Sequence, residues 1–297
     1  MRTRYRVFTG ALIVLLGAGL AAVGVITHRV DGRYLDAAGV RLHYTDEGQG
    51  EAVLLLHGFA VNSDLNWRLP GITAALARQF RVIALDLRGH GLSGKPHASG
   101  EYGLEMVRDV PRLLDHLQLE KAHLVGYSLG GFVALKAAAL YPRRLRDLSL
   151  IGAGWEGPEN SAFLHALDEF ADALEAGRAI GPLIARLGPG QPSPGFLHTA
   201  LNKVMTGFFS DKAALAALTR SLPALTLTEQ DLRSVSLPVC AIVGSRDPLR
   251  ASAEAMRGQV RDFTLVLLEG AGHISAAGRS ETRKVLANFL KTGQCGY

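Results

Sequence analysis

The chain has 297 residues, of which 48% are hydrophobic and 20% charged, and this length suffices for the core of one large α/β domain. The net charge is +5, but Arg2, Arg4, Arg6 and Arg29 supply four of these charges and residues 1–30 contain no acid, so the remainder carries +1 (5 − 4). With no basic stripe interleaved with aromatic residues, this balance excludes nucleic acid as a partner. The ten histidines and two cysteines show no metal-ligand spacing, so we expect no metal site.

The first predicted element is an uncharged apolar segment over residues 7–27, which follows Arg2, Arg4 and Arg6. As a helix with about 1.5 Å rise per residue it would reach about 30 Å, the thickness of the hydrocarbon core of a bilayer. No small-residue cleavage site follows it, so we expect residues 1–30 to form an uncleaved signal anchor, a single transmembrane helix. The arginines predict a cytoplasmic N-terminus and an extracytoplasmic domain, most simply at a bacterial inner membrane. Secretion after cleavage is the alternative.

Residues 31–297 alternate between strand-like apolar runs and amphipathic runs. Such alternation predicts an α/β fold with a mostly parallel sheet flanked by helices on both faces. That the sheet has eight strands, six of them before the cap, is implied by the family resemblance described below. The strand-like runs are residues 40–44, 52–56, 81–86, 122–127, 145–151, 239–243 and 263–268. The amphipathic runs are residues 67–79, 104–117, 129–140, 251–260 and 280–290.

Two polar turns follow the early strand-like runs. His57-Gly58-Phe59 comes after residues 52–56, and Asp86 opens the segment Asp-Leu-Arg-Gly-His-Gly-Leu-Ser that includes His90. We interpret His57, Asp86 and His90 as structural residues that hydrogen-bond to nearby backbone.

Ser128 lies in Gly-Tyr-Ser-Leu-Gly-Gly, between the strand-like run 122–127 and the amphipathic run 129–140. Glycines on both sides of a serine at a sharp strand-to-helix turn let the two elements approach without Cβ clashes. The pattern therefore predicts a nucleophile elbow with Ser128 at its tip. In this geometry the backbone N–H of Leu129 is one donor to an oxyanion, and we assign the second donor to the N–H of Phe59.

About 85 residues separate the strand-like run that ends at Ile151 from the next one. We expect a helical cap here, at about residues 153–236, inserted after the sixth strand. Apolar residues recur at helical spacing over residues 163–170 and 213–218, whereas the Gly- and Pro-rich run 188–195 predicts a loop. The Met-Thr-Gly-Phe-Phe patch at residues 205–209 is best explained by ordinary packing within the cap.

Asp247 and His273 each stand just after a late strand-like run, in Gly-Ser-Arg-Asp-Pro and Gly-Ala-Gly-His. Since the carboxyl ends of parallel strands share one edge of a sheet, Ser128, Asp247 and His273 are expected to converge there. His273 would act as general base, and Asp247 would orient its imidazole. Glu156, after the strand-like run 145–151, is the alternative acid.

The two cysteines occupy very different positions. Cys240 lies in a predicted core strand and Cys295 among the last three residues, so a disulfide would need the tail to reach the interior. We therefore expect two free thiols.

Together these motifs resemble the α/β-hydrolase superfamily, and within it the branch of serine esterases, monoacylglycerol lipases and non-haem haloperoxidases. The resemblance covers about residues 40–290 and includes the chain order of Ser128, Asp247 and His273. It implies a serine hydrolase that requires no cofactor, most simply a carboxylic ester hydrolase acting on an apolar or lipid-derived ester. Epoxide hydrolases and haloalkane dehalogenases of this superfamily use an aspartate nucleophile, which Ser128 does not match.

Two alternatives keep the fold and change the function. The same three residues also serve perhydrolysis and carbon–carbon bond hydrolysis in this superfamily, and a substrate panel separates these reactions. A non-catalytic ligand-binding protein is the other alternative, which the complete set of motifs disfavours. The natural substrate and the oligomeric state are not specified by the sequence.

Overall fold

A computed structural model describes residues 32–176 and 211–297. The contacts divide the chain into two compact units, Met1–Gly32 and Arg33–Tyr297, and the second carries every element named below. The expected membrane segment at residues 7–27, the loop at 188–195 and the patch at 205–209 lie outside the described residues. Within the described ranges, no helix is both long enough and apolar enough to cross a bilayer.

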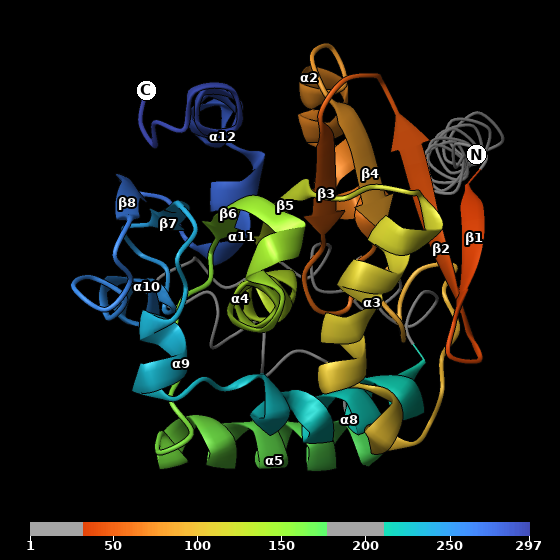
Figure 1. The fold of residues 1–297 in the computed structure, drawn as a ribbon. Coiled ribbons are helices and arrows are strands. Elements are labelled where there is room, and N and C mark those ends of the chain that lie inside the picture. Colours follow the sequence, from red (N-terminus) through yellow and green to blue (C-terminus); the bar gives the residue numbers. More distant parts are fainter. Residues whose placement is uncertain (1–31, 177–210) are drawn as a thin grey trace, which may run out of the picture. The chain divides into compact units, whose positions relative to one another are not determined.

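The second unit is built on one eight-stranded sheet in the order β1-β2-β4-β3-β5-β6-β7-β8 (Figure 1). The β1–β2 and β2–β4 pairs are antiparallel, and the pairs from β4 through β8 are parallel. The predicted mostly parallel sheet of eight strands is therefore confirmed. The strands are β1 (Arg33–Ala37), β2 (Val40–Glu47), β3 (Ala52–Leu56), β4 (Arg81–Leu85), β5 (Ala122–Tyr127), β6 (Leu145–Ile151), β7 (Val239–Gly244) and β8 (Phe263–Leu268).

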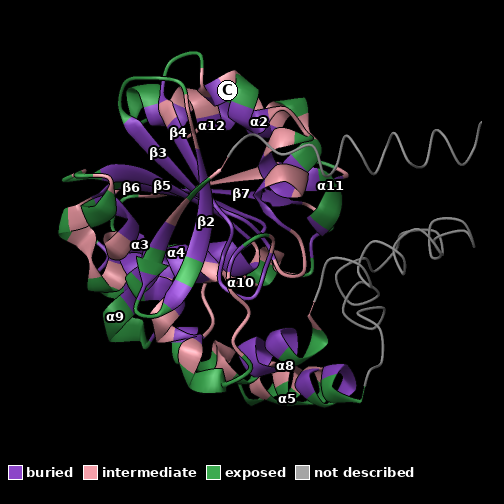
Figure 2. Ribbon diagram, turned by 90° about the vertical axis from the view of Figure 1, so that its right-hand side faces the viewer, coloured by how far each residue is buried: buried purple, intermediate pink, exposed green. Residues whose placement is uncertain are grey.

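Helices cover both faces of this sheet (Figure 2). The main ones are α2 (Ile72–Leu76), α3 (Leu104–His116), α4 (Leu129–Leu140), α11 (His273–Gly278) and α12 (Ser280–Thr292). Side chains of β3 alternate between the two layers: Leu54 and Leu56 pack in the cluster of α3 and α4, while Val53 and Leu55 pack in that of α2 and α12. Burial on both faces explains why β3 reads as a continuous apolar run.

Three local features differ from the sequence-based expectations. The run 67–79 is not one helix: it divides into a short π-helical turn, η1 (Asp64–Arg68), and α2, because Pro70 and the left-handed Gly71 (φ 78°) interrupt it. The run 251–260 is helical only as α10 (Arg250–Glu254). The edge strand β1 was not among the seven runs, since it buries only Leu35 and Ala37.

A helical cap lies between β6 and β7, as expected. Its described helices are α5 (Ser161–Glu175), α8 (Lys212–Ser221), the 3-10 turn η4 (Leu222–Leu225) and α9 (Glu229–Arg233). Asn160 and Asp211 begin α5 and α8 by accepting backbone N–H groups with their side chains, each at 3.1 Å. The two helices lie side by side (Figures 1 and 2).

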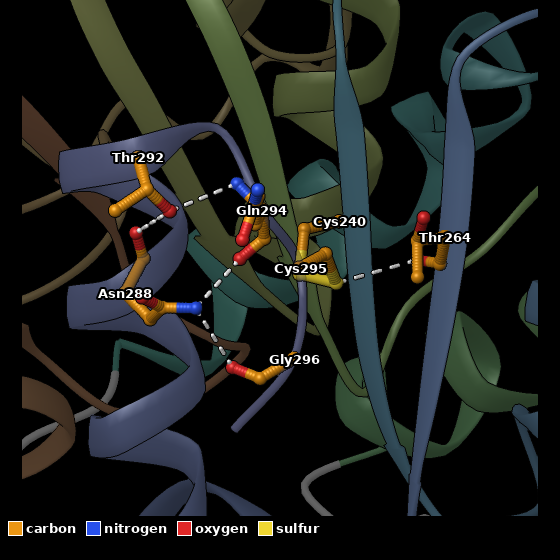
Figure 3. The surroundings of a disulfide bond; sticks show 7 residues. All are labelled: Cys240, Thr264, Asn288, Thr292, Gln294, Cys295 and Gly296. Atoms are coloured by element: carbon orange, nitrogen blue, oxygen red, sulfur yellow. Dashed lines mark hydrogen bonds between the residues drawn. A yellow bond between two sulfur atoms is a disulfide. The ribbon is translucent and has the colours of Figure 1, made fainter.

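The expectation of two free thiols is wrong, because Cys240 and Cys295 form a disulfide with their Cα atoms 5.4 Å apart (Figure 3). The expectation assumed that the tail would have to enter the core. Instead, α12 packs over the face of β7 on which Cys240 lies, with Phe289 in the same cluster. Gly293 (φ 73°) then ends α12 and turns the chain back, so that Cys295 reaches Cys240 from the surface.

Candidate active site

Ser128 lies at a strained strand-to-helix turn between β5 and α4. Its backbone has φ 51° and ψ −116°, a conformation that non-glycine residues rarely adopt. The flanking glycines make room for this turn: a Cβ on Gly126 would lie 2.3 Å from the Gly130 carbonyl oxygen, and one on Gly130 would lie 2.2 Å from that of Leu56. The Ser128 N–H donates to the Ile151 carbonyl at 2.9 Å, which anchors the turn to β6. The geometry is that of the predicted nucleophile elbow.

The structure brings Ser128, His273 and Asp247 into one hydrogen-bonded chain. Nε2 of His273 lies 3.0 Å from Oγ of Ser128, and its Nδ1 lies 3.0 and 3.1 Å from the two carboxylate oxygens of Asp247. Asp247 and His273 are both buried. The carboxylate also accepts the N–H of Leu249 at 2.9 Å, which fixes its orientation. A carboxylate at Nδ1 keeps the proton there and leaves Nε2 free to accept the Ser128 proton.

Two residues that the sequence analysis did not single out support His273. The Tyr127 ring stacks on the imidazole with the centroids 5.3 Å apart, and its hydroxyl donates to the His273 carbonyl at 3.2 Å. Burial raises the pKa of Tyr127, so the hydroxyl remains a donor. Gly152 (φ 55°) passes so close that a Cβ would lie 3.1 Å from the His273 ring. The position of Tyr127 next to Ser128 was the only signal that the sequence offered for these contacts.

The loop after β3 lies against the elbow and carries the second predicted oxyanion donor. The Gly130 N–H donates to the His57 carbonyl at 3.1 Å, and the Gly58 N–H donates to the Asn66 side chain at 2.9 Å. Within the described part of the chain, the N–H groups of Phe59 and Leu129 donate to no protein acceptor. Both groups are therefore available to a ligand atom near Ser128.

His57, Asp86 and His90 take the structural positions predicted for them. Burial lowers the pKa of both imidazoles, that of His90 to about 3, so both rings are neutral at pH 7. Burial alone would raise the pKa of Asp86, but hydrogen bonds from His43 and the N–H groups of Ser63 and Leu92 hold it well below its ordinary value. Asp86 thus links the loops that follow β3 and β4.

Glu156 does not take the place of the acid. One of its carboxylate oxygens accepts from the Ser252 hydroxyl and the other from the Asn160 amide at 2.6 Å, whereas Nδ1 of His273 faces Asp247. Among the residues that the structure describes, no group of three or more His, Cys, Asp or Glu side chains has the arrangement of a metal site.

An apolar pocket of about 720 Å³, its open mouth included, adjoins Ser128. The loop after β3 and the helical segments α4, α5 and η4 contribute most of its wall. Its described lining consists of Phe59, Ser128, Leu129, Phe132, Glu156, Phe163, Leu167, Phe170, Leu222, Leu225, Thr226 and Leu249. Only three of these residues, Ser128, Glu156 and Thr226, are polar. The pocket therefore suits an apolar group attached to the atom that Ser128 attacks.

Known proteins share both this fold and parts of this sequence. The family described as "alpha/beta hydrolase fold" matches residues 51–204. A relative from Pseudomonas putida, named the dihydrolipoyllysine-residue acetyltransferase component of an acetoin cleaving system, is 34% identical over 250 residues, which cover 82% of this chain and 64% of the relative. The chain thus spans slightly less than two thirds of that relative's length.

Two further matches are shorter or more distant. A 2-hydroxymuconate semialdehyde hydrolase from a Pseudomonas species is 40% identical over 125 residues, which cover 41% of this chain and 43% of the relative. The solved structure of an enol-lactonase from Burkholderia xenovorans superposes with a TM-score of 0.69 at 22% identity, over 87% of this chain and all of that one, a likeness that shows the fold. With a family match over more than half of its residues, this chain belongs to the alpha/beta hydrolase fold family.

Proposed function

We propose that this protein is a serine hydrolase that cleaves carboxylic esters with an apolar acyl or alcohol group. One observation carries the proposal: the hydrogen-bonded chain of Ser128, His273 and Asp247 adjoins a pocket with a mostly apolar lining. A serine hydroxyl is a poor nucleophile at neutral pH, and a neighbouring imidazole oriented by a carboxylate is the arrangement that activates it.

The proposed mechanism has two acyl-transfer steps. Ser128 Oγ attacks the ester carbonyl carbon while its proton moves to Nε2 of His273, and the N–H groups of Phe59 and Leu129 bind the oxyanion. Collapse of this intermediate breaks the bond to the alcohol, which takes the proton from His273. Water then attacks the acyl carbonyl carbon while its proton moves to Nε2 of His273. The bond to Ser128 Oγ breaks, Oγ takes that proton back from His273, and the acid is released. These steps need no cofactor.

Carbon–carbon bond hydrolysis is the second candidate, which the match to a 2-hydroxymuconate semialdehyde hydrolase favours. A muconate-derived substrate carries a carboxylate, and a cationic side chain in the site is the strongest partner for it. Among the described residues, the pocket lining includes no Lys or Arg, and its one charged member is the acidic Glu156. This charge distribution supports a neutral ester over an anionic dienoate.

We also propose that the enzyme acts outside the cytoplasm, attached to a membrane through residues 7–27, with a lipid-derived ester as substrate. The disulfide between Cys240 and Cys295 supports this location, because disulfides persist in oxidising compartments. Secretion after cleavage of the segment is the alternative. Detection of peptides containing Arg2 in the mature membrane fraction would support the anchor, and their absence from a secreted protein would support cleavage.

The decisive experiment treats the purified full-length protein with a fluorophosphonate and maps the adduct by mass spectrometry. The proposal predicts a label on Ser128, no label in a Ser128→Ala variant and normal labelling of the matched control Ser161→Ala at the exposed start of α5. A folded wild-type protein without a label would contradict it. Esters of increasing acyl length, tested beside a dienoate with a carboxylate, then separate the two reactions.

A further inference from the structure

Residues 57–60 after β3, called here the oxyanion loop, carry the proposed donor Phe59. The peptide group before Phe59 contacts the imidazole of His57, and the one after it contacts that of His90. The carbonyl of Gly58 accepts a hydrogen bond from Nδ1 of His57 at 2.7 Å. A trans peptide is planar, so its C=O and N–H point in opposite directions. Fixing the Gly58 carbonyl on one side therefore directs the Phe59 N–H to the other side, away from the His57 ring.

The next peptide group is held by His90. The Ala60 N–H donates to Nε2 of His90 at 3.0 Å, and Nδ1 of the same ring donates to the Arg88 carbonyl at 3.2 Å. This pair of contacts sets the tautomer, with the proton on Nδ1 and a lone pair on Nε2. Ala60 needs such support, because its φ of 57° lies in the left-handed region that a residue with a Cβ avoids.

His90 is also packed tightly beneath this loop. It is only 2% exposed, and its ring meets that of Phe59 edge-on at 5.9 Å and that of His57 at 5.0 Å. Burial holds its pKa near 3, so that Nε2 remains an acceptor at neutral pH. His90 makes no hydrogen bond to the chain of Ser128, His273 and Asp247 within the described residues. Its hydrogen bonds hold the backbone just after the proposed oxyanion donor, and its ring packs against His57, which holds the backbone just before it.

We propose that His90 is a positioning residue for catalysis: it holds the Phe59–Ala60 peptide and so fixes the backbone that follows Phe59, while His57 holds the preceding Gly58–Phe59 peptide, and together they point the Phe59 N–H at the developing oxyanion. This inference rests on the proposed function and extends it to a side chain that contacts no substrate. A donor that is slightly misdirected binds the ground-state carbonyl almost as well but loses stabilisation of the transition state. The proposal therefore predicts a lower kcat with little change in KM.

Three substitutions at position 90 distinguish the effect of the Nε2 hydrogen-bond acceptor from the effect of the packing of the ring. His90→Phe keeps the packing against Phe59 and removes the acceptor, His90→Gln keeps an acceptor near the position of Nε2, and His90→Asn carries its amide only as far as Nδ1. His116→Phe is the matched control, since His116, at the end of α3, also packs against an aromatic ring, that of Tyr44 on β2. Each full-length variant is assayed with one neutral ester, and its melting temperature is measured in parallel.

A second readout isolates the oxyanion. An aliphatic trifluoromethyl ketone forms a bond between its carbonyl carbon and Ser128 Oγ; the serine proton moves to His273, and the C=O becomes an oxyanion in the hole. Because this adduct mimics the tetrahedral intermediate, its affinity should change in parallel with kcat/KM. A substitution that merely loosens the fold would lower the fraction of active protein and leave the inhibition constant of the remainder unchanged.

We expect His90→Phe to lower kcat by about 10- to 100-fold, less than the roughly 100- to 1000-fold loss typical when a whole oxyanion donor is removed, with KM within about threefold of wild type. The trifluoromethyl ketone should bind more weakly by a similar factor. The kcat of His90→Gln should lie near that of the wild type, and the kcat of His90→Asn should lie near that of His90→Phe. If His90→Phe does not fold, the comparison of Gln with Asn remains decisive.

Two results would overturn the proposal. One is wild-type kcat in folded His90→Phe, and the other is equal activity of the Gln and Asn variants. Both require an active wild-type protein, so they differ from failure of the proposed function, in which the wild-type protein itself neither hydrolyses esters nor reacts with the fluorophosphonate.

Discussion

The sheet and the cap meet at the pocket, but they are held in very different ways. Strands β5 and β7, which precede Ser128 and Asp247, are buried along their whole length, as is most of α4. In the cap, α8 is buried over residues 214–219, but α5, which supplies much of the pocket wall, buries only Ala171, Ala173 and Leu174. The described cap cluster of Leu174, Leu215 and Ala216 is small, and it packs against Phe59 and Phe170.

This difference separates the chemistry from the selection of substrate. Reacting groups need positions fixed to a fraction of an ångström, which a fully buried sheet provides. A pocket wall needs only shape and apolar surface, which a few cap helices supply. Lys136 of α4 and Trp155 hold the returning end of the cap by donating to the carbonyls of Thr226 and Leu227, both at 2.7 Å. Substitutions near the sheet should therefore change kcat, and those in the cap should change selectivity.

The largest effect is expected at the sheet edge, for Asp247→Asn. The neutral amide no longer enforces the proton on Nδ1 of His273, so kcat should fall by about 10⁴ with KM nearly unchanged. Steady-state kinetics on a neutral ester measures this, with the exposed Asp262→Asn as the matched control. A loss of less than tenfold would mean that another carboxylate orients His273, and Glu156 would then be tested by the double substitution.

The second effect concerns the disulfide that fastens the tail to β7. It closes a loop of 55 residues, and its removal by Cys295→Ser should lower the free energy of unfolding by about 2–4 kcal/mol. The kcat of the folded enzyme should change less than twofold, because Asp247 follows β7 at its other end. Denaturant unfolding of the wild type with and without a reductant provides the control. A reductant that leaves the unfolding midpoint unchanged would contradict the prediction.

Most of the site could be predicted from the sequence because its parts are local. An elbow, an acid loop and a terminal histidine each lie just after an apolar strand, and a parallel sheet brings such positions together whatever lies between them. Ser128, His273 and Asp247 consequently meet within hydrogen-bonding distance, as expected. The central strands were equally readable, since burial on both faces makes β3, β5 and β7 continuous apolar runs, whereas the partly exposed edge strand β1 was missed.

Features that depend on contacts between distant segments could not be predicted in this way. The pairing of Cys240 with Cys295 depends on where α12 crosses the sheet, and the stacking of Tyr127 on His273 depends on how two loops meet. Gly152 looks like an ordinary loop glycine until the His273 ring is placed beside it. Such signals are absent from the local pattern, because they arise only when the layers are assembled.

The third prediction returns to the histidines beneath the oxyanion loop. The pKa of His90 is about 3 in the folded protein and 6.5 ordinarily, so between these values the unfolded chain binds a proton that the folded one does not. Unfolding free energy should therefore fall as the pH drops from about 6.5 towards 3, by up to about 1.4 kcal/mol per pH unit from this residue. His90→Gln should reduce the slope, and the lowered pKa of His57 should preserve part of it. The unfolding free energy is measured by denaturant titration at a series of pH values. The same pH dependence in the wild type and in His90→Gln would refute this account.

The smallest effect is expected in the cap, where Phe163 lines the pocket and its ring packs at a tilt of 38° to that of Phe132, with ring centroids 6.1 Å apart. Phe163→Ala removes part of the apolar wall, and a long acyl chain can contact more of this wall than an acetyl group can. We expect KM for an octanoate ester to rise about tenfold, a loss within the 1–3 kcal/mol typical of hydrophobic pockets, and KM for the acetate to change less than twofold. Leu164→Ala, next to it on α5 but outside the pocket lining, is the control. Equal changes for both esters would mean that the cap acts on the chemistry as well, and the division between sheet and cap would fail.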